Sequence, residues 1–424
     1  HLPELAFLIL GTYFTAPFKT VMGENKKTMN ITKKQKQWLI VLAGFLLSGV
    51  NVGINTNCNT AFLNPVCEDL GLSISSFALT ASIVSFVSIP CLLAIPQLLK
   101  KMSARSLLIF SGMGFILFKI LFGCAEELWQ FYACSVGIGI FAPGFGYLTV
   151  NSIINRTFTE NNGLAVGIAS SGAGIVGAVA LPVVTWMISA KGWRSGYYLE
   201  AVLALLFIGF AVILIGGEKK ETQEETVSHS SRWKMSGQEK IAFLLLLVGL
   251  FLLCLVGMGI QPYLMPYMKS IGYTTAFAAG VVSGILTINT AAKIISGYVF
   301  DRVGTIGAAG ITAGTMIVSL LLLVLLKGSP VVYLFAVIFS FAYVALSIPA
   351  PYFTRQLFGA DHFTELYSIV MIVTSVGGAV GNTLTGLLLE MSGSYIFVWV
   401  CYISLVIAAA GCLSAAILVK KREG

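Results

Sequence analysis

The sequence predicts an all-α membrane protein with about twelve transmembrane helices. Of its 424 residues, 57% are hydrophobic and only 10% are charged, whereas a soluble domain carries roughly 25% charged residues. The apolar residues form long runs, and about 20 such residues cross a bilayer as a helix. The runs are too long for the ~10-residue alternating strands of a membrane barrel. The composition therefore excludes both a soluble domain and a β-barrel.

The apolar runs fall into two sets of six on either side of a charged segment, 217–240, which has no apolar periodicity. Such a composition is typical of a solvated linker. We expect an N-terminal tail (1–37), a first six-helix bundle (38–216), a cytoplasmic linker (217–240), a second bundle (241–419) and a C-terminal tail (420–424). The expected spans are Trp38–Phe62, Ser75–Leu98, Ser106–Cys124, Leu128–Ile154, Leu164–Ala190, Gly196–Gly216, Ile241–Met268, Ala276–Phe300, Ile306–Leu326, Pro330–Thr354, Thr364–Leu389 and Tyr395–Val419.

Lysine and arginine gather at one end of these spans, which the positive-inside rule places in the cytoplasm. We therefore expect a multi-pass protein of the cell (inner) membrane with both termini cytoplasmic, and the net charge of +8 needs no nucleic-acid partner. Met29 opens a natural start before the first span, so we expect residues 1–28 to be upstream or added sequence. The basic residues at this end are Lys33, Lys34, Lys36, Lys100, Lys101, Arg105, Arg156, Arg302, Arg355, Lys420, Lys421 and Arg422.

One charged residue stands alone in the eighth expected span. Lys293 is the only charged residue in Ala276–Phe300, and a lysine at mid-span costs about 2.5–3.5 kcal/mol on insertion scales. Such residues usually face a cavity and have a function. Asn289 lies one helical turn earlier and shares its face. An amide beside a fixed positive charge predicts binding of an anion.

Other polar residues in the spans are candidates for lining the same cavity. Asn55 and Asn59 share one face of the first span, and the alternative for them is interhelical hydrogen bonding. Further candidates lie towards the ends of the fourth and seventh spans and inside the tenth. For the tyrosines among them, the alternative is the interfacial aromatic belt. These candidates are Tyr147, Asn151, Gln261, Tyr263 and Tyr343.

The expected spans hold no acidic residue at depth. Glu200 and Glu390 lie near span ends, and we expect Lys119 to extend to the membrane interface. Proton coupling through a buried carboxylate is thus unsupported, so anion exchange or uniport is favoured. The sequence has no P-loop, zinc-protease motif or nucleophile elbow. We expect no enzyme activity, catalytic residue, cofactor or metal.

The eighth span ends in the motif GYVFDRVG, with Gly297, Asp301, Arg302 and Gly304 at its fixed positions. This resembles the signature G-x-x-x-D-R-x-G of the major facilitator superfamily. A carboxylate at a helix end can cap the N-terminus of a neighbouring helix, so we expect these four residues to gate the cytoplasmic side. The first-half counterpart, Ala94–Arg105, keeps the positive charges but lacks the acid, which argues against a symmetric latch.

The two halves also share a glycine-rich pattern. SGAGIVG at Ser171–Gly177 in the fifth span returns as SVGGAVG at Ser375–Gly381 in the eleventh. Parallel repeats of six spans place the substrate site between the halves. Chance similarity between glycine-rich helices is the alternative.

Within that superfamily, the chain from Trp38 onward is similar to the bacterial oxalate/formate antiporter-like and monocarboxylate transporter group. Asn151–Gly174 and Asn289–Lys293 carry the similarity. It implies a major facilitator fold, alternating access, transport of a small organic anion (a mono- or dicarboxylate), and pairing of Lys293 with the substrate carboxylate. Asn289 stands where monocarboxylate transporters carry an Asp. A drug exporter on the same fold and a non-transporting membrane receptor are the alternatives, and the counter-anion or proton that accompanies transport stays open.

Overall fold

A computed structural model describes residues 33–158, 160–215, 235–326 and 329–421. Helices and short turns make up these ranges, which contain no strand. The expectations for residues 1–28 and for most of the linker fall outside them. Contacts along the chain separate His1–Lys36 from one compact unit, Gln37–Gly424, which holds the apolar helices.

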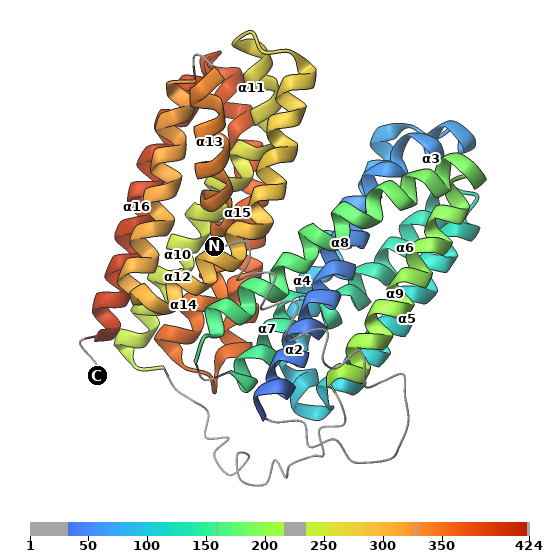
Figure 1. Ribbon diagram of the computed structural model, residues 1–424, viewed down its shortest axis with the longest axis horizontal. Coiled ribbons are helices and arrows are strands. Elements are labelled where there is room, and N and C mark those ends of the chain that lie inside the picture. Colours follow the sequence, from blue (N-terminus) through green and yellow to red (C-terminus); the bar gives the residue numbers. More distant parts are fainter. Residues whose placement is uncertain (1–32, 159, 216–234, 327–328, 422–424) are drawn as a thin grey trace. The chain divides into compact units, whose positions relative to one another are not determined.

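In the first half of the chain, α5 packs against α9, α4 against α6, and α8 against both η1 and α9 (Figure 1, blue to green). The first span is not a regular α-helix throughout, because its middle part, η1, is π-helical. The elements of this half are α2 (Lys33–Ser48), η1 (Gly49–Asn57), η2 (Cys58–Ala61), α3 (Leu63–Leu70), α4 (Ile74–Lys101), α5 (Ala104–Cys124), α6 (Leu128–Phe141), η3 (Ala142–Phe145), α7 (Tyr147–Thr157), α8 (Asn162–Lys191) and α9 (Trp193–Ile215).

In the second half, α10 packs against α15 and α16, and α12 against α13 and α16 (Figure 1, yellow to red). Ser236 accepts the N–H of Glu239 and so caps the start of α10. The elements are α10 (Gly237–Ile260), η5 (Gln261–Tyr263), α11 (Leu264–Ser270), α12 (Thr275–Val324), α13 (Ser329–Ala342), η6 (Tyr343–Leu346), α14 (Pro349–Phe358), α15 (Phe363–Ser392) and α16 (Tyr395–Lys421).

The prediction of about twelve spans agrees with this structure. Ten helices of the described ranges are long and apolar enough to cross a membrane, and Val331–Leu346 with Pro349–Phe358 forms an eleventh, bent by 48°. α12 has 50 residues, which at 1.5 Å per residue would reach about 75 Å, far beyond a ~30 Å hydrocarbon core. Its backbone leaves the helical region at Gly304, where φ is 70°. α12 therefore contains the two spans expected on either side of that glycine.

The buried charges differ from the prediction. We expected Lys119 to reach the interface and Glu200 to lie near a span end, but both are buried, with 2% and 0% of their surfaces exposed. Lys119 Nζ lies 2.8 Å from Glu200 Oε2, which joins α5 to α9. The rings of Phe115 and Tyr197 flank the ammonium group. Each charge is tolerated at this depth because the other neutralises it.

Candidate functional site

Lys293 lies where the first and second halves of the chain meet. Its side chain is half-buried, and no described residue gives its ammonium group a hydrogen bond or an ion pair. Its backbone touches α8, because a Cβ atom added to Gly167 would lie 2.6 Å from the Lys293 carbonyl oxygen. Only glycine allows α8 and α12 to approach this closely. The junction therefore carries a positive charge that no described residue compensates.

The contact between α8 and α12 continues towards the cytoplasmic end that we predicted. A Cβ atom on Gly163 would lie 2.6 Å from the carbonyl oxygen of Gly297, and a Cβ on Gly297 would collide with the Gly163 carbonyl. Gly297 is thus needed for packing, which gives its place in the GYVFDRVG motif a physical reason. Gly304 breaks α12 with its positive φ, a conformation that glycine adopts without strain.

Asp301 caps α8 from across the junction. Its Oδ1 and Oδ2 accept the backbone N–H groups of Gly163 and Leu164, each at 2.9 Å. These N–H groups belong to the first turn of α8 and have no partner within that helix. The residue before the helix, Asn161, supplies no side-chain cap. The second half of the chain thus provides the cap that α8 lacks.

Two arginines surround this contact. Arg302 is exposed, and its guanidinium lies 4.9 Å from the centre of the Tyr298 ring. Arg355 interacts electrostatically with Asp301 and donates from Nη2 to the carbonyl oxygen of Phe158 in the first half. Sequence reasoning placed Arg355 at the cytoplasmic end of its span and gave it no further role. The signal that could have linked it to Asp301 is the opposite charge of the two residues, since both follow or end spans at the same predicted side.

Asn289 does share the region of Lys293, but its amide already has a partner. Its side chain is 5% exposed, and Nδ2 donates to the carbonyl oxygen of Ser340 at 2.8 Å. This bond joins α12 to α13. One of the two N–H groups of the Asn289 amide is therefore used within the protein.

A cavity of about 130 Å³ lies between α7 of the first half and four elements of the second. Of the predicted site residues, Tyr147 lines it, while Lys293 is not among its lining residues. Most of the lining is apolar or aromatic, with hydroxyl groups as the polar part. The lining residues are Tyr147, Cys254, Met258, Leu346, Ser347, Ala350, Tyr367, Met371, Thr374 and Ser375.

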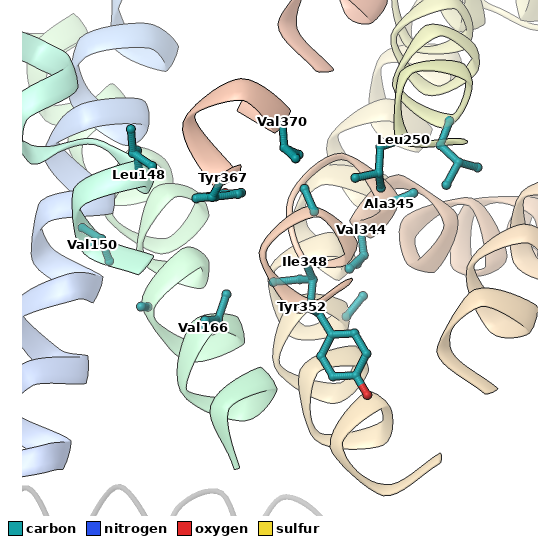
Figure 2. Packing of buried hydrophobic residues seen from close by; sticks show 14 of the residues in the cluster. Leu148, Val150, Val166, Leu250, Val344, Ala345, Ile348, Tyr352, Tyr367 and Val370 are labelled. Carbon is teal, nitrogen blue, oxygen red and sulfur yellow. The ribbon is translucent and has the colours of Figure 1, made fainter. Parts of the chain in front are cut away.

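Two further predicted residues adjoin this cavity. Asn151 donates from Nδ2 to the Tyr367 hydroxyl at 3.1 Å, and Figure 2 shows Tyr367 beside Leu148 of α7. The hydroxyl of Tyr343 lies 3.9 Å from the sulfur of Met258. Asn151 and Tyr343 thus contact residues of the cavity wall without lining it themselves.

The remaining candidates lie elsewhere. Asn55 and Asn59 are half-buried in and after the π-helical turn, and no side-chain partner joins them to another described residue. π-Helical turns are rare in proteins, and those that occur are often found at functional sites. Gln261 is half-buried, and Tyr263 donates to the carbonyl oxygen of Asn382 at 3.3 Å. The structure therefore forms two groups, one along α8 and α12 and one around the cavity, and leaves these four residues outside both.

Comparisons with known proteins support the fold. The sequence profile of the Major Facilitator Superfamily matches residues 41–359. Monocarboxylate transporter 13 of Rattus norvegicus is 24% identical over 391 residues, which cover 89% of this chain and 88% of the relative. The multidrug resistance protein MdtG of Serratia proteamaculans is 24% identical over 229 residues, covering 52% and 54%. A crystal structure of the transporter FucP in the outward conformation has a TM-score of 0.65 at 14% identity and covers 92% of this chain and 98% of its own.

The long apolar helices and the superfamily match define a multi-pass membrane transporter and not an enzyme. The chain belongs to the Major Facilitator Superfamily.

Proposed function

We propose that the protein carries a small organic anion across the membrane, with Lys293 as the group that pairs with the substrate carboxylate. The observation that carries this proposal is the half-buried ammonium group without a partner at the junction of α8 and α12. A charge at this depth needs compensation, and an incoming carboxylate supplies it. Curated relatives with the name monocarboxylate transporter support the same substrate class.

The number of basic side chains without an anionic partner favours a substrate with one carboxylate over a substrate with two. Lys119 forms an ion pair with Glu200. Arg355 donates a hydrogen bond to the Phe158 carbonyl and interacts electrostatically with Asp301. Within the described span interiors, Lys293 is then the cation that remains. A second substrate carboxylate would enter a cavity wall of tyrosine, methionine and hydroxyl groups without a counter-charge.

Exchange of anions or facilitated uniport fits the charges better than proton symport. Asn289 is neutral and donates to Ser340, while Glu200 is held by Lys119 inside the first half. Neither residue offers a free carboxylate beside Lys293. The counter-ion is therefore a second anion or none.

We infer that the two expected six-helix bundles act as rocking units and that the structure is closed on the cytoplasmic side. The inter-half contacts described above join helix ends that carry the excess of lysine and arginine. This excess supports cytoplasmic termini in the cell (inner) membrane. Asp301 with Gly163 and Asn151 with Tyr367 are such contacts. The likeness to FucP in its outward conformation supports this assignment.

Uptake into proteoliposomes tests the proposal directly. Pyruvate, benzoate and succinate are offered to the parent protein and to Lys293→Ala, with Lys269→Ala as control because Lys269 is exposed at the end of α11. We expect monocarboxylate uptake by the parent and the control, and none by Lys293→Ala at equal protein and unchanged melting temperature. Uptake by Lys293→Ala at the parent rate rejects the site.

A second candidate is export of amphipathic molecules. The apolar and aromatic lining of the cavity favours it, and so do relatives with the names MdtG and agnestins efflux protein AgnL12. Thermal shifts with a panel of hydrophobic cations, beside the carboxylates, separate the two. Export predicts stabilisation by the cations in both the parent and Lys293→Ala. A receptor without transport predicts stabilisation by a ligand and no flux of any compound.

A further inference from the structure

α12 and α13 are fastened to each other by a pair of reciprocal hydrogen bonds one helical turn from Lys293. Asn289 Nδ2 donates to the Ser340 carbonyl oxygen at 2.8 Å, and Ser340 Oγ donates to the Ile285 carbonyl oxygen at 3.1 Å. Each helix thus offers a donor to a backbone acceptor of the other. Both side chains are buried, with 5% of Asn289 and 0% of Ser340 exposed. We name Asn289 and Ser340 the α12–α13 clasp.

The clasp bonds exceed what helix packing alone requires. The Ile285 carbonyl lies inside α12 and already accepts an intrahelical bond, so the bond from Ser340 Oγ is additional. The Ser340 carbonyl lies in the last turn of α13, where a carbonyl has no α-helical partner, and Asn289 supplies its donor. Ser340 Oγ also bonds the Ala336 carbonyl of its own helix. By contrast, the buried Ser319 in the later part of α12 bonds only the Thr315 carbonyl of its own helix. The interhelical bonds therefore occur at the turn next to Lys293 and not at Ser319.

The position of Lys293 is fixed from two sides. On one side, Gly167 of α8 contacts the backbone carbonyl of Lys293. On another, the clasp holds the preceding turn of α12 against α13. Lys293 is a long side chain with several rotatable bonds, so its ammonium group reaches a defined place only when its backbone is held. A displaced charge loses affinity for a bound carboxylate because the Coulomb energy falls with distance.

We propose that the α12–α13 clasp is a positioning site for Lys293 and sets the affinity for the substrate carboxylate; this inference rests on the proposed function. Asn289 acts as an obligatory hydrogen-bond donor to Ser340 and not as a ligand of the anion. An ionised carboxylate at position 289 would face the Ser340 carbonyl with no proton to share. A protonated carboxyl group would restore the donor.

The test measures dissociation constants for benzoate and pyruvate on purified full-length protein in nanodiscs at pH 5.5 and pH 8.5. The variants are Asn289→Leu, Asn289→Asp and Ser340→Ala, and Ser319→Ala is the matched control. We expect Asn289→Leu to raise both dissociation constants about tenfold at either pH. Asn289→Asp should raise them at pH 8.5 and recover towards the parent value at pH 5.5. Ser340→Ala should weaken binding, while Ser319→Ala should match the parent.

Recovery by acid in Asn289→Asp separates positioning from a general loss of stability, because a misfolded variant does not regain affinity for benzoate at low pH. The clasp proposal is overturned when Asn289→Leu and Ser340→Ala bind as tightly as the parent while Lys293→Ala does not bind. A folded Asn289→Asp that is equally weak at both pH values also overturns it. Absence of carboxylate binding by the parent rejects the proposed function itself.

Discussion

The carboxylate of Asp301 near the end of the eighth span lies 2.9 Å from the backbone nitrogen of Gly163 at the start of α8. This contact joins the second half of the chain to the first. It uses the exposed N–H groups and the positive end of the α8 dipole. Because opening of the proposed cytoplasmic gate separates α8 from α12, the bond must break once in every transport cycle.

Removal of the carboxylate should therefore favour the state that is open to the cytoplasm. In Asp301→Ala, two N–H groups of α8 lose their acceptor, and loss of a helix cap costs about 0.5–2 kcal/mol. We expect faster modification of a cysteine at the cavity residue Ser375 by an impermeant thiol reagent added from the cytoplasmic side. The experiment uses Ser375→Cys in a background without the eight native cysteines.

Lys269→Ala is the control for that measurement, since Lys269 is exposed at the end of α11 and lies outside the proposed gate. Its labelling rate should equal that of the parent. Equal rates for Asp301→Ala and the parent would contradict a gating role for the carboxylate.

Replacing one member of the buried pair of Lys119 and Glu200 should lower the stability of the protein more than replacing both. Lys119→Met leaves Glu200 as an uncompensated charge with 0% exposure, and breaking a buried pair from one side costs about 3–5 kcal/mol. The double variant Lys119→Met, Glu200→Leu removes both charges and should lie close to the parent. Thermal unfolding in one detergent compares the three proteins. Single variants as stable as the parent would show that the pair is dispensable.

An ion pair also joins the halves at the surface, where Lys100 in the last turn of α4 pairs with Glu365 in the first turn of α15. The first-half motif lacks an acid after its span, and the structure places the acid on the opposite helix instead. Both side chains are exposed, so the pair contributes roughly 0.2–1 kcal/mol and is screened by salt. We expect Lys100→Glu to speed cytoplasmic labelling at low salt and to have little effect at high salt.

The charge-swapped variant Lys100→Glu, Glu365→Lys recreates the pair in reverse and should return the labelling rate to that of the parent. Asp301→Ala should stay fast at both salt concentrations because its hydrogen bonds are to backbone groups. A Lys100→Glu phenotype that is independent of salt would contradict an electrostatic latch.

Sequence reasoning predicted the features that depend on short, continuous stretches of the chain. Each span is a continuous apolar run, so its length and position follow from transfer energetics, and the break at Gly304 follows from a glycine inside the GYVFDRVG motif. A helix cap by Asp301 could also be predicted, because a carboxylate at a helix end can accept the free N–H groups at the N-terminus of a neighbouring helix. The structure identified that N-terminus as α8.

Contacts between side chains of helices that are distant in the sequence could not be predicted in this way. Lys119 and Glu200 belong to spans three helices apart, and each looks like a residue near a span end until their contact is known. The spacing puts Asn289 one helical turn from Lys293, but the sequence could not show that its amide donates a hydrogen bond to the Ser340 carbonyl. The π-helical winding of Gly49–Asn57 likewise depends on how α8 packs against it.

The close approach of α8 and α12 at Lys293 gives the last prediction. A Cβ on Gly167 would lie 2.6 Å from the Lys293 carbonyl oxygen and 3.2 Å from the Ile294 Cα, both backbone atoms that cannot rotate away. Gly167→Ala should therefore push the helices apart, at a cost of about 1–3 kcal/mol in the state described here, and lower benzoate affinity together with uptake. Gly209→Ala on α9 is the matched control, because a Cβ there meets no atom within 4 Å. The control should transport normally and melt no lower than the parent, since alanine stabilises a helix interior relative to glycine. Normal benzoate affinity in Gly167→Ala would mean that the position of Lys293 does not depend on α8.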